Sequence, residues 1–156
     1  MIFIARILAV GSYQEHNKAE LLDKKNNNWT DVAPINYPSK FGLFAIIFYK
    51  GGFFVFGGQD GNMEDKPGIQ RFDEEKREWS WVGRLRNPRR GHGVIHDGET
   101  FVVAGGNSQT IENCIWRPEL ARPLMFCEEN LFNLTLQNYI SYPEVALVHD
   151  EFDTEC

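Results

Sequence analysis

Two closely spaced histidines are the first candidates for metal binding or catalysis in this chain. His92 and His96 lie four residues apart, a metal-ligand spacing on a helix and a same-face spacing on a strand. Zinc needs three or four protein ligands, and no third ligand is evident near this pair. The sequence also contains no GxSxG or HExxH motif and no Cys-His pair in a motif context. We therefore expect no metal site, no cofactor and no enzymatic activity.

Arginines form the strongest basic cluster, at Arg84, Arg86, Arg89 and Arg90. Acidic residues lie nearby in sequence, and a solvated loop is the default place for such charges. The net charge of −6 argues against general binding to nucleic acid or to anionic membranes. No apolar run approaches the ~20 residues of a membrane span. We therefore expect neither nucleic acid nor a membrane as a partner.

Cys114 and Cys127 are expected on adjacent antiparallel strands, where they could form a disulfide or remain two buried free thiols. Cys156 is left over in the acidic end of the chain and could pair with another chain. Asn28 and Asn133 begin glycosylation triplets, which matter only in a secreted protein. A bridged pair would favour an extracellular or secretory location, and free thiols a cytoplasmic one. The first ten residues fit a signal peptide poorly because Arg6 interrupts the apolar run.

The elements that would position these residues recur along the chain. Apolar runs end in Gly57-Gly58 and Gly105-Gly106, and Gly106 follows Gly58 by 48 residues. An apolar-acidic pair is followed six residues after its Asp by a tryptophan, at Asp73 and Trp79 and again at Asp23 and Trp29, 50 residues earlier. A period near 50 with strand-like content is typical of kelch repeats.

The segments FFVFGG, FDEEKREW, RRGHG and FVVAGG resemble kelch repeats of a β-propeller. The resemblance is close for residues 53–107, weaker for 7–36 and weakest after Asn107. It implies four-stranded blades in which the double glycine ends the second strand, the aromatic-acidic pair ends the third, and the tryptophan opens the fourth. His92 then matches the start of a first strand. The glycines are expected to allow backbone angles and close strand approach that other residues cannot adopt, rather than to bind phosphate. Trp29 and Trp79 are expected to pack between blades rather than to bind a ligand.

The predicted fold is therefore all-β, a kelch-type propeller fragment with four-stranded antiparallel blades in an open arc. Residues 1–150 form the partial propeller, with blade units at about 7–40, 41–88 and 89–148, and residues 149–156 form an acidic tail. The first unit lacks its first strand. Residues 44–48 are expected to form a strand buried on both faces, and residues 145–148 resemble the first strand of a further blade. Three blades are fewer than the usual four to eight, although a dimer could make a six-blade ring.

The resemblance also implies a platform that binds another protein, with contacts from loops on one face. The loops between second and third strands are expected at residues 13–18, 59–68 and 107–110, and the connection from the fourth to the next first strand is the second choice. The candidate contact residues are Gln59, Asp60, Asn62, Arg86, Arg89, Arg90 and Asn107. One alternative is a kelch-type oxidase or mutarotase, which would bring His92, Arg89 and a loop carboxylate within about 4 Å. Another is a partial gene product without independent function.

Overall fold

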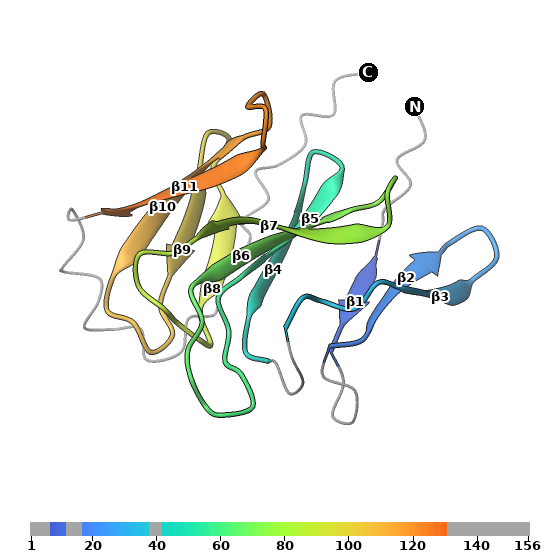
Figure 1. Cartoon of the computed structure of the whole chain (residues 1–156), viewed down its shortest axis with the longest axis horizontal. Coiled ribbons are helices and arrows are strands. Elements are labelled where there is room, and N and C mark those ends of the chain that lie inside the picture. Colours follow the sequence, from blue (N-terminus) through green and yellow to red (C-terminus); the bar gives the residue numbers. More distant parts are fainter. Residues whose placement is uncertain (1–6, 12–16, 38–41, 131–156) are drawn as a thin grey trace, which may run out of the picture.

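The computed structural model describes residues 7–11, 17–37 and 42–130, and every regular element in these ranges is a β-strand (Figure 1). The strands are β1 (Leu8–Val10), β2 (Ala19–Asp23), β3 (Asn28–Val32), β4 (Ala45–Tyr49), β5 (Gly52–Phe56), β6 (Gly68–Asp73), β7 (Glu78–Arg84), β8 (Gly93–His96), β9 (Phe101–Ala104), β10 (Ile111–Arg117) and β11 (Leu124–Asn130). The all-β prediction is confirmed. The described residues contain no helix that could cross a membrane.

The strands form antiparallel meanders that correspond to blades. Blade 1 is a three-stranded sheet in the order β1-β2-β3. Blade 2 is β4 to β7 and blade 3 is β8 to β11, and the two together form an eight-stranded sheet in the order β4-β5-β6-β7-β11-β10-β9-β8. In the described part of the chain, blade 1 therefore contains the predicted second, third and fourth strands and no first strand.

Blades 2 and 3 meet at both their outer and inner strands. The outer strands β7 and β11 pair in parallel at Gly83 and Met125. A Cβ at position 83 would lie 2.5 Å from the Met125 carbonyl oxygen, so this approach requires glycine. The inner strands β4 and β8 pack together, and the ring of Tyr49 stacks on that of His96 with centroids 3.9 Å apart.

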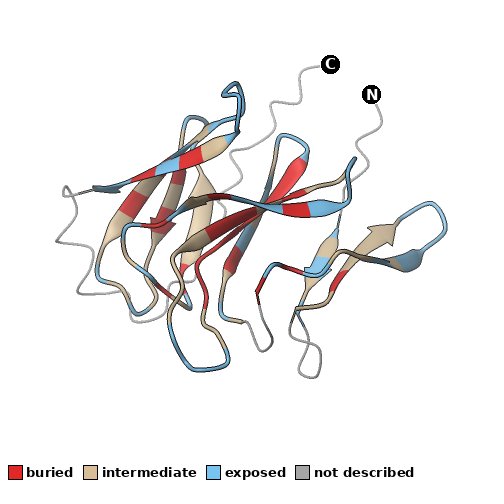
Figure 2. Ribbon diagram, in the orientation of Figure 1, coloured by how far each residue is buried: buried red, intermediate tan, exposed pale blue. Residues whose placement is uncertain are grey.

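The core is centred on β5, every residue of which is buried (Figure 2). Phe54 and Phe56 pack into an apolar cluster shared with blade 3, and Phe53 and Val55 pack into a second cluster shared with blade 1. Successive side chains of a strand point to opposite faces, so a middle blade presents an apolar residue to each neighbour. This arrangement explains the unbroken apolar run before Gly57.

The prediction that residues 44–48 are buried on both faces is wrong. They contribute most of β4, in which Ile46 is 39% exposed and Phe48 is 45% exposed. One face of β4 packs toward β8, whereas the described part of blade 1 provides no first strand to cover the other face. Burial of this inner strand thus depends on the neighbouring blade, which the apolar pattern does not reveal.

The turns after β2 and β6 are two copies of one structure. Leu22 pairs with Trp29 in blade 1 as Phe72 pairs with Trp79 in blade 2. Asn27 and Arg77, 50 residues apart, both adopt left-handed backbone angles, with φ of 50° and 57°.

In each of these two turns the aspartate caps the backbone. The Asp23 carboxylate accepts a hydrogen bond from the Lys25 N–H, and the Asp73 carboxylate accepts one from the Glu75 N–H. Burial alone would raise the pKa of Asp73, but the Lys76 N–H and the Arg71 guanidinium outweigh it and leave that pKa below its usual value. The repeated aspartate therefore has a structural role.

Candidate functional site

Three loop segments gather at one end of the blades, drawn below the sheets in Figure 1. They are the loop between β5 and β6 (residues 57–67), the connection between β7 and β8 (residues 85–92) and the loop between β9 and β10 (residues 105–110). We call these segments, together with residues 42–44 before β4, the loop face. The turns from third to fourth strands lie at the opposite end of the blades.

A polar network links these three segments. The Arg90 guanidinium forms an ion pair with Asp65, with Nη1 2.7 Å from Oδ1. The Asn107 side-chain amide donates to the other oxygen of the same carboxylate, and the side-chain Oδ1 of Asn107 accepts from the Arg90 backbone N–H at 2.8 Å. The two loop types that the sequence left as separate candidates therefore form one surface, in which Arg90 and Asn107 join adjacent blades.

The loop between β5 and β6 is ordered by its own charges. The Asp60 carboxylate accepts backbone N–H bonds from Asn62 and Glu64 and lies 2.7 Å from the Lys66 ammonium group. Lys66, followed by the Glu64 N–H, holds the pKa of Asp60 below its usual value. The Gln59 side chain donates to the Met63 carbonyl at 2.9 Å. Asp60 and Gln59 thus shape the loop, whereas Asn62 stands exposed at its tip.

Arg89 is not a solvated loop residue, and this expectation from the sequence is wrong. Its side chain is fully buried, and its Nη2 lies 2.8 Å from Oε1 of the equally buried Glu112 on β10. The guanidinium also donates to the carbonyl and hydroxyl oxygens of Thr110, both at 2.7 Å. Buried charges require such pairing, so Arg89 supports the loop face from below and offers no contact surface. Sequence alone could not pair it with a carboxylate 23 residues away.

The same Glu112 carboxylate holds the start of the connection between blades 2 and 3. It accepts backbone N–H bonds from Arg86 at 2.6 Å and from Asn87 at 2.9 Å. The Arg86 side chain, which is exposed, donates to the Cys127 carbonyl at 3.0 Å. Arg86 therefore remains at the surface as expected, with its backbone fixed by the neighbouring blade.

His92 lies under the glycines of the loop face and is only 8% exposed. Burial, followed by the positive charge of Arg89, lowers the pKa of His92 to about 4, so the imidazole is neutral at pH 7. Neither ring nitrogen makes a well-formed hydrogen bond to the described residues, and a weak contact with the Phe56 backbone offsets only part of this lowering of the pKa. The Arg89 guanidinium donates to Glu112 and Thr110 rather than to the His92 ring.

The two histidines have different surroundings. His96 stacks on Tyr49, and the residues that the structure describes contain no group of three His, Cys, Asp or Glu that could hold a metal ion.

The double glycines have the backbone role expected of them. Gly57 has a φ of 56°, and a Cβ there would lie 2.7 Å from the Arg89 carbonyl and 2.8 Å from the His92 ring. Gly58 donates its N–H to that same carbonyl at 2.8 Å. In blade 3, Gly105 and Gly106 also have positive φ, and a side chain at 106 would meet the Arg90 carbonyl. Any larger residue would push the connection away.

The two repeat tryptophans differ in their surroundings. Trp79 is 8% exposed and lies between blades 1 and 2, where its Nε1 donates to the Ala33 carbonyl at 2.8 Å and its own carbonyl accepts from Asn36 at 3.1 Å. Trp29, at the equivalent position of blade 1, is 44% exposed. The expectation that both pack between blades holds for Trp79 and is wrong for Trp29, because the described residues place no further blade against that side of blade 1.

Cys114 and Cys127 form a disulfide, so the first of the two sequence alternatives is the one that the structure shows. They are direct partners across β10 and β11. Asn28 is exposed at the start of β3. Asn133, Cys156, the expected strand at 145–148 and the tail at 149–156 lie outside the described residues, as does most of the loop at 13–18.

Two apolar residues of the loop face were missed by the sequence reasoning. Met63 is 77% exposed at the tip of the loop between β5 and β6, and Leu43 is 59% exposed just before β4. Both adopt left-handed backbone angles, with φ of 64° and 56°. The neighbouring Gly42 pairs with Gln59, and the Leu43 carbonyl accepts from the Gly91 N–H at 2.8 Å. Nothing in the local sequence marks either position as exposed.

Comparison with known proteins agrees with this geometry. No family model matches the chain. Kelch-like protein 21 of Bos taurus is 30% identical over 102 residues, covering 58% of this chain and 17% of that protein. Its counterpart from Homo sapiens is 30% identical over 78 residues, covering 50% of this chain and 13% of that protein. This chain thus spans less than a fifth of the length of these relatives.

A solved structure, that of YjhT, superposes with a TM-score of 0.55 at 18% identity over 67% of this chain and 32% of its own. The chain is a segment of kelch-repeat β-propeller. Its blades have the double glycines, the capping aspartates and the Trp79 contact between blades 1 and 2 at the positions that the repeat pattern predicts.

Proposed function

We propose that this kelch segment is a protein-binding module that contacts its partner through the loop face. The observation that carries the proposal is the network of Asp65, Arg90 and Asn107, which joins loops of two blades into one surface. Loops fixed on a rigid scaffold are where binding functions concentrate. A preformed surface also loses less conformational entropy on binding than separate mobile loops would.

The composition of the loop face suits contact with another protein. Leu43 and Met63 are its exposed apolar residues, and the polar side chains of Asn62, Gln59 and Arg86 lie on the same face. Protein interfaces commonly combine apolar anchors with a polar rim, and methionine and arginine are enriched in them. We therefore assign the anchoring role to Leu43 and Met63.

Quantitative affinity capture from the source cells tests this proposal with three forms of the protein. The double variant Leu43→Asn/Met63→Asn removes both apolar side chains and keeps residues that tolerate left-handed backbone angles. The control Lys24→Asn/Lys25→Asn changes two exposed residues in the turn between β2 and β3, away from the loop face.

We expect proteins captured by the wild type to be retained by the control and lost by the loop-face variant. Equal capture by all three forms, or no specific capture by the wild type, would contradict the proposal. Melting curves of the three forms confirm that each is folded.

A further inference from the structure

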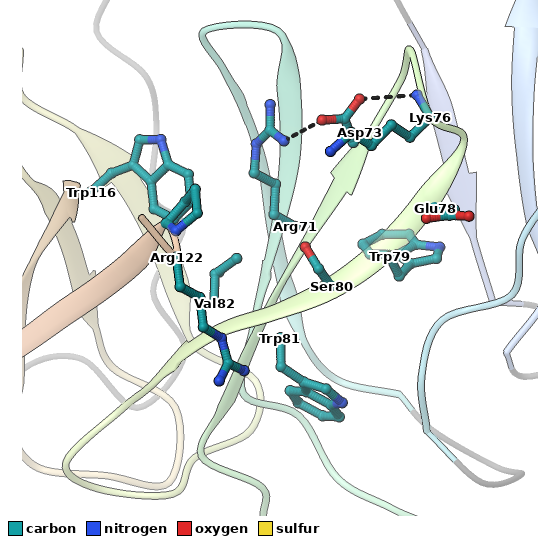
Figure 3. Close-up of a pocket in the computed structure, with 11 residues that line it drawn as sticks. Arg71, Asp73, Lys76, Glu78, Trp79, Ser80, Trp81, Val82, Trp116 and Arg122 are labelled. Atoms are coloured by element: carbon teal, nitrogen blue, oxygen red, sulfur yellow. Dashed lines mark hydrogen bonds and ion pairs between the residues drawn. The ribbon is translucent and has the colours of Figure 1, made fainter. Parts of the chain in front are cut away.

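A pocket of about 390 Å³ lies at the end of the blades opposite the loop face (Figure 3). One wall is β7 of blade 2, and the other is the end of β10 with the turn that leads to β11 in blade 3. The outer strands of these blades pair only at Gly83 and Met125 within the described residues. The pocket lies where they diverge, on the side of the third-to-fourth turns.

An open strand edge forms part of the pocket. Residues 78–82, five consecutive residues of β7, line it. This strand pairs with β6 on one side, and on its other side the described chain provides a strand partner only at Gly83. The Trp79 carbonyl is engaged by the Asn36 side chain, so the free stretch begins after it. Exposed strand edges pair readily with extended peptides through backbone hydrogen bonds.

The charges around the pocket favour an acidic ligand. Its lining contains three cationic residues, Arg71, Lys76 and Arg122, and two carboxylates, Asp73 and Glu78. Asp73 is already engaged by Arg71, with Nη1 2.9 Å from Oδ2, and by backbone N–H groups. Arg122 is exposed and makes no hydrogen bond or ion pair with the described residues. The pocket thus has a positive excess in a chain whose net charge is −6.

The ring of Trp116 forms an apolar wall of the pocket, across from the open strand edge. The Arg71 guanidinium carbon lies 5.9 Å from the ring centroids of both Trp116 and Phe54. Gly52 makes room for this placement, because a Cβ there would lie 2.5 Å from the Arg71 Nε. Figure 3 shows Trp116 and Arg122 on one side of the pocket, across from Arg71 and Ser80. The wall therefore offers a ring for apolar contact beside the exposed cation Arg122.

We propose that this pocket binds an extended peptide of a partner protein in which acidic and apolar side chains alternate. The peptide adds alongside β7, its apolar side chains contact Trp116, and its carboxylates pair with Arg122 and Lys76. Alternate side chains of an extended strand point in opposite directions, so such a sequence presents both chemistries at once. The site is separate from the loop face and does not depend on it.

Fluorescence anisotropy of the full chain with a fluorescein-labelled octapeptide of alternating Glu and Val tests this site. The matching Lys-Val octapeptide is the charge control. We expect saturable binding of the Glu-Val peptide with a Kd below about 1 mM, and binding of the Lys-Val peptide that is at least about tenfold weaker.

Two pocket variants and two control variants locate the binding. Arg122→Glu reverses the free cation, and Ser80→Phe fills the pocket from an exposed strand position; each should weaken binding about tenfold. Lys25→Glu makes a similar charge reversal in the corresponding turn of blade 1 and should leave the Kd within about twofold, as should Leu43→Asn/Met63→Asn on the loop face. Absence of saturable binding by the Glu-Val peptide, or equal affinity in the wild type and both pocket variants, would overturn the proposal.

Discussion

The Glu112 carboxylate lies 2.8 Å from the Arg89 guanidinium, and neither side chain has any exposure to solvent. The same carboxylate accepts the backbone N–H groups of Arg86 and Asn87. One buried group on β10 thus fixes the connection by which the chain passes from blade 2 to blade 3. The position of Arg90 and of the loop face above it depends on this pair.

Removing the carboxylate should be costly. Glu112→Ala leaves a buried, unpaired guanidinium and two unsatisfied backbone donors, and we expect a loss of about 3–5 kcal/mol in the free energy of unfolding. Glu119→Ala, in an exposed pair with Arg117 at 3.8 Å, should cost less than about 0.5 kcal/mol. Chemical denaturation of both variants measures the difference. Similar small losses in the two would show that Arg89 is not held as described.

The repeat tryptophans provide a matched pair for testing the seam between blades. Trp79→Ala removes a buried indole and its hydrogen bond to Ala33, and should cost about 3–5 kcal/mol. Trp29→Ala changes a residue that is 44% exposed, and should cost less than about 1 kcal/mol. Thermal melts of the two variants make the comparison. A larger loss for Trp29 would mean that another surface covers it in solution.

The buried His92 predicts a loss of stability in acid. The unfolded imidazole takes up a proton near its usual pKa of 6.5, whereas the folded one resists protonation down to about 4. The unfolded state therefore binds more protons in this window, and stability falls as pH is lowered through it, by on the order of 3 kcal/mol.

Urea denaturation between pH 7 and pH 4 measures this dependence. His92→Gln should flatten the curve, while His96→Gln should keep most of its slope. An unchanged slope in His92→Gln would assign the acid sensitivity to other groups.

The disulfide predicts a defined thiol count. Cys114 and Cys127 should resist alkylation in denaturant without reductant and should both become reactive after reduction. Cys114→Ser/Cys127→Ser should lower the free energy of unfolding by about 3 kcal/mol, because the bridge closes a loop with a sequence separation of 13 residues. Mass spectrometry after alkylation gives the count. Three modified cysteines would contradict the bridge.

Local features of the sequence predicted the strands and turns. The double glycines, the capping aspartates and the hairpins follow from short-range backbone chemistry, and the structure has them where the 50-residue period expects them. Residues 44–48 were a strand as expected, but their burial was wrong because it depends on whether another blade covers them.

Features that depend on distant partners could not be predicted in the same way. Arg89 carries the same charge as Arg86, and only Glu112 on another blade separates their roles. Trp29 and Trp79 have the same repeat position, and only the neighbouring blade distinguishes their exposure. Leu43 and Met63 of the loop face are exposed and adopt left-handed conformations, and sequence patterns for apolar residues indicate neither feature.

Site-specific photo-crosslinking tests the central claim most directly. The photoreactive residue p-benzoylphenylalanine is placed at Met63 on the loop face in one protein and at Lys24 in the opposite turn in another, and both are irradiated in source-cell lysate. We predict discrete protein adducts from position 63 that are absent from position 24. Adducts from position 24 alone, or from neither position, would contradict a partner-binding loop face.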